Sequence, residues 1–185
     1  MGNEPPKLDT SESQQALAAI SAELARAVAA VEAAEAHRLT EEILAAKTVF
    51  VTGEGRSGLV ARGFAMRLGQ LGLRAYVVGE TVAPAAAKGD LLLAISGSGE
   101  TRVTVTHAKT ARALGVRIAA VTAAPESSLA RRAGLRLLIS GASVQYGGSL
   151  FEQAALIVLD TLALILQHRL GQTAGEMDAR HTNLE

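Results

Sequence analysis

Two short segments combine glycine with hydroxyl and charged side chains in a pattern that suits a bound anion. They are GEGRSG at 53–58 and SGSGET at 96–101. Each follows a short apolar run and precedes a helical pattern, so each is expected to join a strand end to a helix start. Free backbone N–H groups and the positive end of the helix dipole converge at such a junction. Both segments are therefore candidate anion sites.

The second segment carries the stronger signal for phosphate. Its hydroxyls, on Ser96, Ser98 and Thr101, are donors suited to phosphate oxygens, and its glycines let the backbone approach closely. A single serine here would be explained by helix N-capping and a tight turn. Three hydroxyls and two glycines in six residues exceed what a cap needs, so a phosphate is favoured.

The first segment is open to more than one interpretation. Gly55, Arg56 and Ser57 are candidates to line a bound ligand, although ordinary turn chemistry explains the loop about as well, and Arg56 also fits a structural ion pair. The spacing G-x-G-x-x-G formally matches a dinucleotide fingerprint, with Glu80 about where a ribose-binding acid belongs. That alternative leaves the second segment unexplained.

Composition excludes several functions. The 185 residues include no Cys, so disulfides, thiolate metal sites and cysteine nucleophiles are ruled out. Eighteen basic and 18 acidic residues, with no Trp, give neither an electrostatic footprint nor a stacking platform for nucleic acid. The polar start lacks a secretion signal, and the apolar region 154–166 is too short to cross a bilayer. We therefore expect a cytoplasmic protein with no membrane and no nucleic-acid partner.

Short apolar runs alternating with helical patterns predict the elements that position these loops. The pattern predicts one α/β domain over 11–185, after a disordered lead-in at 1–10, with a mostly parallel sheet covered by helices on both faces. Ligands bind such sheets at the carboxyl ends of the strands. The predicted strands are 48–52, 74–78, 91–95, 116–122 and 135–139. The predicted helices are 12–37, 40–46, 57–71, 101–114, 127–133 and 149–170, the last capped by Gly171, before a polar tail at 172–185.

The two loop sequences together resemble the sugar isomerase (SIS) domain family. Longer stretches, GEGRSGLVARGFAMRL, YVVGETVAPAAAKGDLLLAISGSGET, GSLFEQAALIVLD and the ending RHTNLE, are similar to the 6-phospho-3-hexuloisomerases over about 31–185. Two departures are Glu54, where a small residue is more usual, and the long lead-in. The resemblance implies a three-layer, flavodoxin-like sandwich around a five-stranded parallel sheet, with the first helix as an addition.

The resemblance also implies an activity. These enzymes interconvert 3-hexulose 6-phosphate and fructose 6-phosphate in the ribulose monophosphate route of formaldehyde fixation, typically as tetramers. We accordingly expect a sugar-phosphate substrate, a homo-oligomer, and no metal or organic cofactor. Three alternatives stay open: a sugar-phosphate-sensing SIS module without catalysis, an isomerase of another sugar phosphate such as a pentose or heptose phosphate, and the nucleotide-binding interpretation.

Two residues become catalytic candidates through this resemblance. Moving the carbonyl from C3 to C2 requires a base that takes the C2 proton to give a 2,3-enediolate, and Glu152 at the start of the last long helix is the candidate. An acid at a helix start is otherwise explained by the dipole alone. His181 is the second candidate, as a proton shuttle in its own site or in that of a neighbouring subunit.

Overall fold

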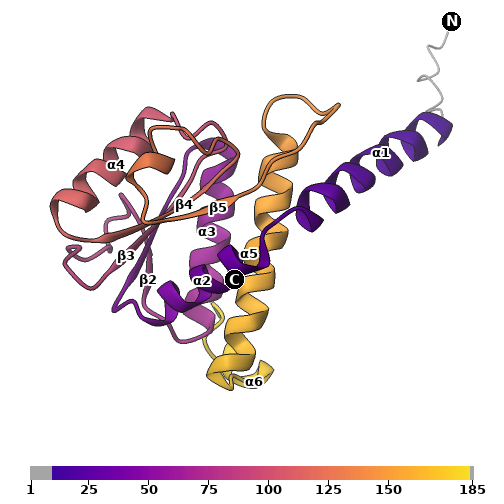
Figure 1. Cartoon of the computed structure of the whole chain (residues 1–185). Helices are drawn as coiled ribbons and strands as arrows, with labels where there is room; N and C mark the ends of the chain where they lie inside the picture. Colours follow the sequence, from indigo (N-terminus) through magenta and orange to yellow (C-terminus); the bar gives the residue numbers. More distant parts are fainter. Residues whose placement is uncertain (1–9, 184–185) are drawn as a thin grey trace, which may run out of the picture.

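A computed structural model describes residues 10–183 (Figure 1). The predicted lead-in lies outside this range except for Thr10, which is the first residue of a helix. The strands are β1 (Val49–Thr52), β2 (Ala75–Val77), β3 (Leu91–Ile95), β4 (Arg117–Thr122) and β5 (Leu135–Leu138). The helices are α1 (Thr10–Ala29), α2 (Ala33–Leu44), α3 (Gly55–Gln70), α4 (Arg102–Ala113), the 3₁₀ turn η1 (Ala130–Arg132), α5 (Ser149–Leu170) and α6 (Ala174–Asp178).

The five strands form one parallel sheet in the order β2-β1-β3-β4-β5. The central strands are apolar on both faces, and every residue of β3 is buried, which is why these strands read as continuous hydrophobic runs. The strand order reverses between β1 and β3, which are paired directly. This reversal is the switch point beside which ligands bind in such sheets. The loops after β1 and β3 are the two glycine-rich segments.

Helices cover both faces of the sheet, which confirms the predicted three-layer architecture. Residues on one face, such as Val51 and Leu93, share a core with α2, α3 and α5. Alternate residues, such as Phe50 and Leu92, share the other core with α4 and η1. Because side chains alternate along a strand, a single apolar run supplies both cores.

The prediction of one long first helix over 12–37 is wrong. The chain breaks after Ala29 and restarts at Ala33, and the second helix absorbs most of the predicted segment 40–46. Residues 30–32 include neither Gly nor Pro, so we attribute the interruption of the helix to tertiary packing. α2 buries Leu39 and Ile43 against the domain, whereas α1 projects from it in Figure 1 and leaves Leu17 66% exposed.

α5 is the central helix of one layer. It is the one helix within residues 10–183 with the length and apolar composition of a membrane span, and half of that apolar window is buried inside the fold. A core helix satisfies the same criteria, and α5 contributes nine buried residues to the core. It ends at Gly171, whose φ of 65° is the left-handed cap that the sequence predicts.

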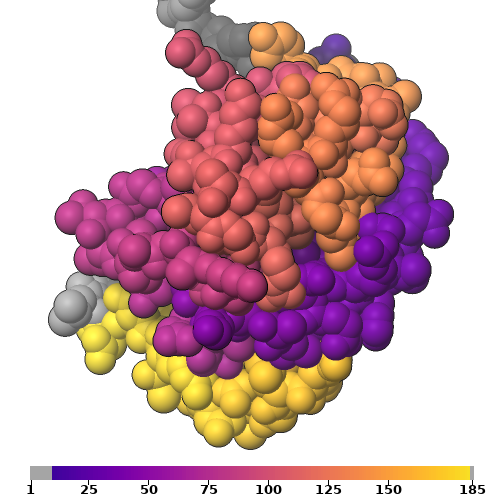
Figure 2. All heavy atoms as spheres, turned by 60° about the vertical axis from the view of Figure 1, so that its left-hand side comes forward, coloured from indigo at the N-terminus to yellow at the C-terminus, as the bar shows by residue number. Residues whose placement is uncertain are grey.

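The segment predicted as a polar tail contains a further short helix. The Thr173 side chain and Glu176 form a reciprocal capping box that starts α6, a signal that the sequence carried in its T-x-x-E spacing. Beyond α6, Arg180 donates to the carbonyl of Gln70 at 3.0 Å and ties the tail to the end of α3. Figure 2 shows the yellow surface of the last helices bordering the purple of α2, where Arg169 and Glu41 form an ion pair.

Candidate active site

The loop after β1 is a tight turn in which glycine is required sterically. A Cβ on Gly58 would lie 2.6 Å from the carbonyl oxygen of Gly53, and a Cβ on Gly53 would lie 2.9 Å from the carbonyl oxygen of Ser57. Gly55 has a φ of 57°, in the left-handed region. The loop therefore presents bare backbone at the start of α3, with Arg56 exposed and Ser57 buried just inside the helix.

The loop after β3 is organised by Ser96. This side chain is buried, and its Oγ accepts the Gly99 N–H at 3.1 Å and lies 3.0 Å from the Thr101 hydroxyl. Thr101 occupies the N-cap position of α4 but makes no side-chain capping bond. N-capping therefore does not account for Thr101, and the Ser96 hydroxyl forms the turn. Gly99 has no room for a side chain, because its Cβ would lie 2.0 Å from Ser127 Oγ.

The other two polar residues of this loop point to different partners. Ser98 is exposed, and its Oγ accepts the Glu100 N–H at 3.2 Å. The Glu100 carboxylate accepts the Ser128 N–H at 2.6 Å, and the bonds from Ser128 lower the pKa of Glu100. A carboxylate next to a bound phosphate would repel it, and the bond to Ser128 holds this one on the neighbouring loop.

The start of α5 packs directly on this second loop. The Phe151 ring lies against Gly97, where a Cβ would come within 3.1 Å of it. The following residue, Glu152, has a side chain 16% exposed and accepts a hydrogen bond from Arg56 Nε through Oε2. The fold thus brings together Arg56, from the first turn of α3, and Glu152, from the first turn of α5. The sequence pattern alone does not indicate that Arg56 and Glu152 are partners.

A cavity of about 340 Å³ lies beside the second loop. Gly97 and Ser98 form part of its wall, and Leu150 and Phe151 form another. The remaining wall comes from the segment between β5 and α5, from α1 and from the residue that follows β4. These residues are Ala27, Ala123, Ile139, Ser140, Gly141, Ser143, Gly147 and Gly148. Sequence reasoning missed them, because nothing in their spacing signals a site. Within this cavity the Ser98 residue of the second loop and Phe151, which precedes Glu152, line the same space.

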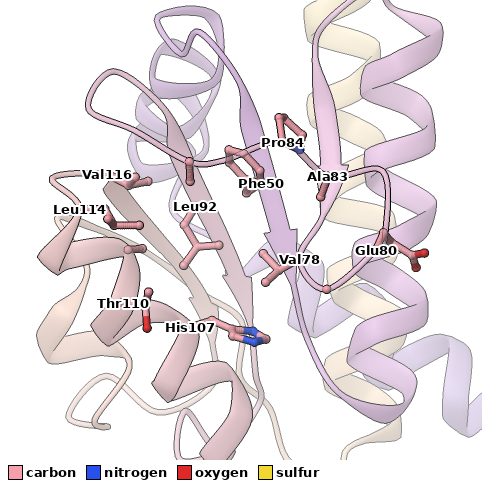
Figure 3. A pocket seen from close by; sticks show the side chains of 13 residues that line it. Phe50, Val78, Glu80, Ala83, Pro84, Leu92, His107, Thr110, Leu114 and Val116 are labelled. Carbon is pink, nitrogen blue, oxygen red and sulfur yellow. The ribbon is translucent and has the colours of Figure 1, made fainter.

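A second cavity, of about 320 Å³, lies on the α4 face of the sheet (Figure 3). Its wall is mostly apolar, with Phe50, Leu92 and Val78 facing α4. At one end His107 lies 2.8 Å from the hydroxyl of Thr52, the last residue of β1. The hydroxyls of the second loop do not line this cavity, so we place the candidate site in the first one.

His181 does not join the other candidates within one chain. It lines a surface groove beside α3 and β2, together with Met66 and Tyr76. Met66 is ten residues, roughly 15 Å, further along α3 than Arg56. The Arg180 tether fixes the tail on this side. The groove that His181 lines therefore includes neither Arg56 nor Glu152.

No group of three or more His, Cys, Asp or Glu side chains within residues 10–183 is placed to hold a metal ion. The hydroxyl and backbone donors of the two loops are suited to a phosphate rather than to a cation.

Comparison with known proteins agrees with the fold and the loops. The SIS domain model matches residues 42–165. The chain is 38% identical over 179 residues to the 3-hexulose-6-phosphate isomerase of Bacillus subtilis (strain 168), covering 91% of this chain and 97% of the relative. It is 42% identical over 178 residues to the protein of the same name from Mycobacterium gastri, covering 91% and 89%.

A solved structure gives the same result. The crystal structure of a hypothetical protein from Methanococcus jannaschii, described as inferring a molecular function of 3-hexulose-6-phosphate isomerase, superposes with a TM-score of 0.86. Its sequence is 34% identical, and the match covers 92% of this chain and 99% of that one.

The fold is α/β, and relatives at 38–42% identity over 91% of the chain show that it is a sugar-phosphate isomerase. The chain belongs to the SIS domain family, and the resemblance to hexulose-phosphate isomerases is confirmed.

Proposed function

We propose that this enzyme interconverts 3-hexulose 6-phosphate and fructose 6-phosphate, as in the ribulose monophosphate route of formaldehyde fixation. Two relatives named 3-hexulose-6-phosphate isomerase match nearly the whole chain and support this choice of substrate. The observation that carries the chemistry is Glu152, a largely enclosed carboxylate held by Arg56 and directly following Phe151, which packs on Gly97 of the loop after β3.

The loop after β3 holds the phosphate in this proposal. The first N–H groups of α4 have no acceptor within the helix, and the helix dipole adds positive potential at the same point. Ser98 and Thr101 supply hydroxyl donors, and Ser96 keeps the turn in shape. Gly55 and Ser57 let the other loop approach the sugar, with Arg56 at its edge. The proposal needs no metal or organic cofactor, since the enediolate is reached by proton transfer alone.

Glu152 acts as the general base. It removes the proton from C2 of the 3-ketose, and the electrons of that C–H bond form the C2–C3 double bond while O3 takes the negative charge. The same carboxyl group returns the proton to C3 while the O2 proton is transferred to O3, so that C2 becomes the carbonyl and C3 carries the hydroxyl. Arg56 orients the carboxylate through its Nε–H and lies near the developing charge.

His181 is proposed as the group that moves protons between O2 and O3, in the site of a neighbouring subunit. Its distance from Glu152 within one chain supports this arrangement. Exposed apolar side chains provide surface for such an assembly, which we propose to be a tetramer. They are Leu17 on α1, Leu59 and Met66 on α3, and Leu156, Ile157, Leu164 and Ile165 on α5. We also place the protein in the cytoplasm, where charged sugar phosphates are retained.

A coupled assay that detects fructose 6-phosphate formed from 3-hexulose 6-phosphate tests the proposal. We expect turnover with this pair and at least tenfold less with a pentose 5-phosphate or a heptose 7-phosphate. Faster turnover of another sugar phosphate would change the assigned substrate. Saturable binding of fructose 6-phosphate without any turnover would instead indicate a sensing module.

A further inference from the structure

α1 buries an acidic side chain for which the reaction has no use. Glu23 is only 6% exposed, although the helix that carries it projects from the domain. Burying a carboxylate is costly unless donors satisfy its oxygens. An apolar residue would pack α1 onto the domain as well, as Ala27 does one turn later. The burial of Glu23 therefore calls for a more specific explanation than helix packing.

The donors all come from the segment between β5 and α5, residues 140–148, which we call the strap. Ser143 donates its hydroxyl to Glu23 Oε2 at 2.7 Å, and the Val144 N–H donates to Oε1 at 2.8 Å. The amide of Gln145 adds a longer bond of 3.4 Å to Oε2. The bond from Ser143, followed by that from Val144, lowers the pKa of Glu23. Three consecutive strap residues are thus fixed by one carboxylate.

The same network reaches the start of α5. Gln145 and Gln153 exchange two amide hydrogen bonds, of 3.1 and 2.9 Å. Gln153 is the residue directly after Glu152. A continuous chain of polar contacts therefore runs from α1 through the strap to the helical turn that carries the proposed base.

The strap is otherwise held mainly at its ends, where Gly141 lies against Leu150 and the Ser149 hydroxyl donates to the Tyr146 carbonyl at 2.9 Å. Val144 and Tyr146 are 81% and 97% exposed, so their side chains contribute almost no packing. Yet five strap residues line the candidate cavity together with Gly97 and Ser98: Ser140, Gly141, Ser143, Gly147 and Gly148. The shape of this part of the cavity depends on the polar contacts made by Glu23.

We propose that Glu23 is a positioning residue, which holds the strap as a wall of the substrate cavity and sets the start of α5. This assignment rests on the proposed function for its kinetic consequence. The hydrogen bonds and the cavity wall do not depend on which sugar phosphate is bound.

The kinetic test compares Glu23→Ala and Glu23→Gln with Glu12→Gln, a matched change on the exposed first turn of α1. Glu23→Ala should raise KM for fructose 6-phosphate about tenfold or more and lower kcat less, because the cavity wall is lost while Glu152 remains. Glu23→Gln should recover part of the loss, since its amide oxygen can still accept the Val144 N–H. Kinetic constants for Glu23→Ala equal to those of Glu12→Gln would overturn the proposal.

A second measurement does not need activity. Tyr146 is an exposed aromatic residue in the strap, so chymotrypsin should cut after it once the strap loosens. We expect cleavage at Tyr146 at least tenfold faster in Glu23→Ala than in Glu12→Gln, with the remaining chain still folded by circular dichroism. Gln153→Ala should give an intermediate rate, because it breaks only the link to α5. Equal cleavage rates in Glu23→Ala, Gln153→Ala and Glu12→Gln would refute the role of Glu23.

The two measurements separate this inference from the proposed function. If the unaltered enzyme fails to isomerise 3-hexulose 6-phosphate, the proposed function fails, and the cleavage experiment still decides whether Glu23 holds the strap. If the unaltered enzyme is active and cleavage at Tyr146 is unaffected by Glu23→Ala, only the present inference fails.

Discussion

Arg56 and Glu152 lie 96 residues apart in the chain and form an ion pair at the carboxyl edge of the sheet. Arg56 starts the helix after β1, and Glu152 starts the helix that packs on the loop after β3. The pair therefore spans the point where the strand order reverses. The side chain of Arg56 is far more exposed than that of Glu152, so the arginine is free to respond to a ligand while the carboxylate stays in place.

Replacing the proposed base tests this arrangement. Glu152→Gln keeps the shape and an acceptor for Arg56 but removes the basic carboxylate, so turnover should fall by about 10²-fold or more. Binding of fructose 6-phosphate should persist, because the phosphate contacts are on another loop. The variant should also lose exchange of the reacting C–H proton with deuterated solvent, measured by NMR. Glu126→Gln, at an exposed position, is the control. Unchanged exchange in Glu152→Gln would assign the base elsewhere.

The phosphate loop is tested by removing its two accessible hydroxyls. Ser98→Ala and Thr101→Ala should each weaken binding of fructose 6-phosphate by about 1.5–3 kcal/mol, as expected for a hydrogen bond to a charged group. Titration calorimetry gives the affinity. Thr106→Ala removes a hydroxyl from the exposed face of the same helix, where it bonds to the Arg102 carbonyl, and should leave binding unchanged. Unaltered affinity in the double variant would exclude this loop as the phosphate site.

A site shared between subunits predicts complementation. His181→Ala and Glu152→Gln should each be nearly inactive as pure proteins. When the two are mixed, unfolded and reassembled together, some sites receive both intact side chains, and part of the activity should return. Light scattering should report an oligomer, near tetramer mass. A monomer with full activity, or a mixture no more active than its components, would contradict the shared site.

Acid should destabilise the loop region through Glu100. The hydrogen bonds from Ser128 hold the pKa of Glu100 below its ordinary value of 4.5. The Glu100 carboxylate therefore binds a proton more readily in the unfolded chain than in the folded one. The hydrogen bonds from Ser128 consequently stabilise the fold at pH values above 4.5. The contribution should fall away as the pH drops below about 4.5 toward the folded pKa. In thermal melts between pH 3 and 6, Glu100→Gln should show a shallower pH dependence than the unaltered chain, while Glu126→Gln should not.

Two glycine substitutions should act in opposite directions on stability. Gly99→Ala places a Cβ 2.0 Å from Ser127 Oγ at a φ of 61°, so it should lower the melting temperature and weaken phosphate binding. Gly63→Ala, in the interior of α3 with nothing within 4 Å, should stabilise by about 0.4–1 kcal/mol. Differential scanning calorimetry measures both. A neutral Gly99→Ala would show that the turn can relax without cost.

Apolar patterning along the chain was sufficient to predict the parallel sheet and most of its covering helices. Apolar runs such as Leu91–Ile95 have only one favourable environment, a strand buried on both faces, and the glycine-rich segments that follow must turn into helices. Local signals also placed both candidate loops and the end of α5 at Gly171, because caps and tight turns depend on neighbouring residues.

The contacts between residues far apart in the chain could be found only from the three-dimensional fold. The pairing of Arg56 with Glu152 and the bonds to Glu23 join segments far apart in the chain. The break after Ala29 and the position of His181 follow from packing between such segments. The conformational preferences of neighbouring residues do not predict these contacts. An alanine-rich stretch is equally good as one helix or two, and burial of Leu39 and Ile43 against the domain selects the second.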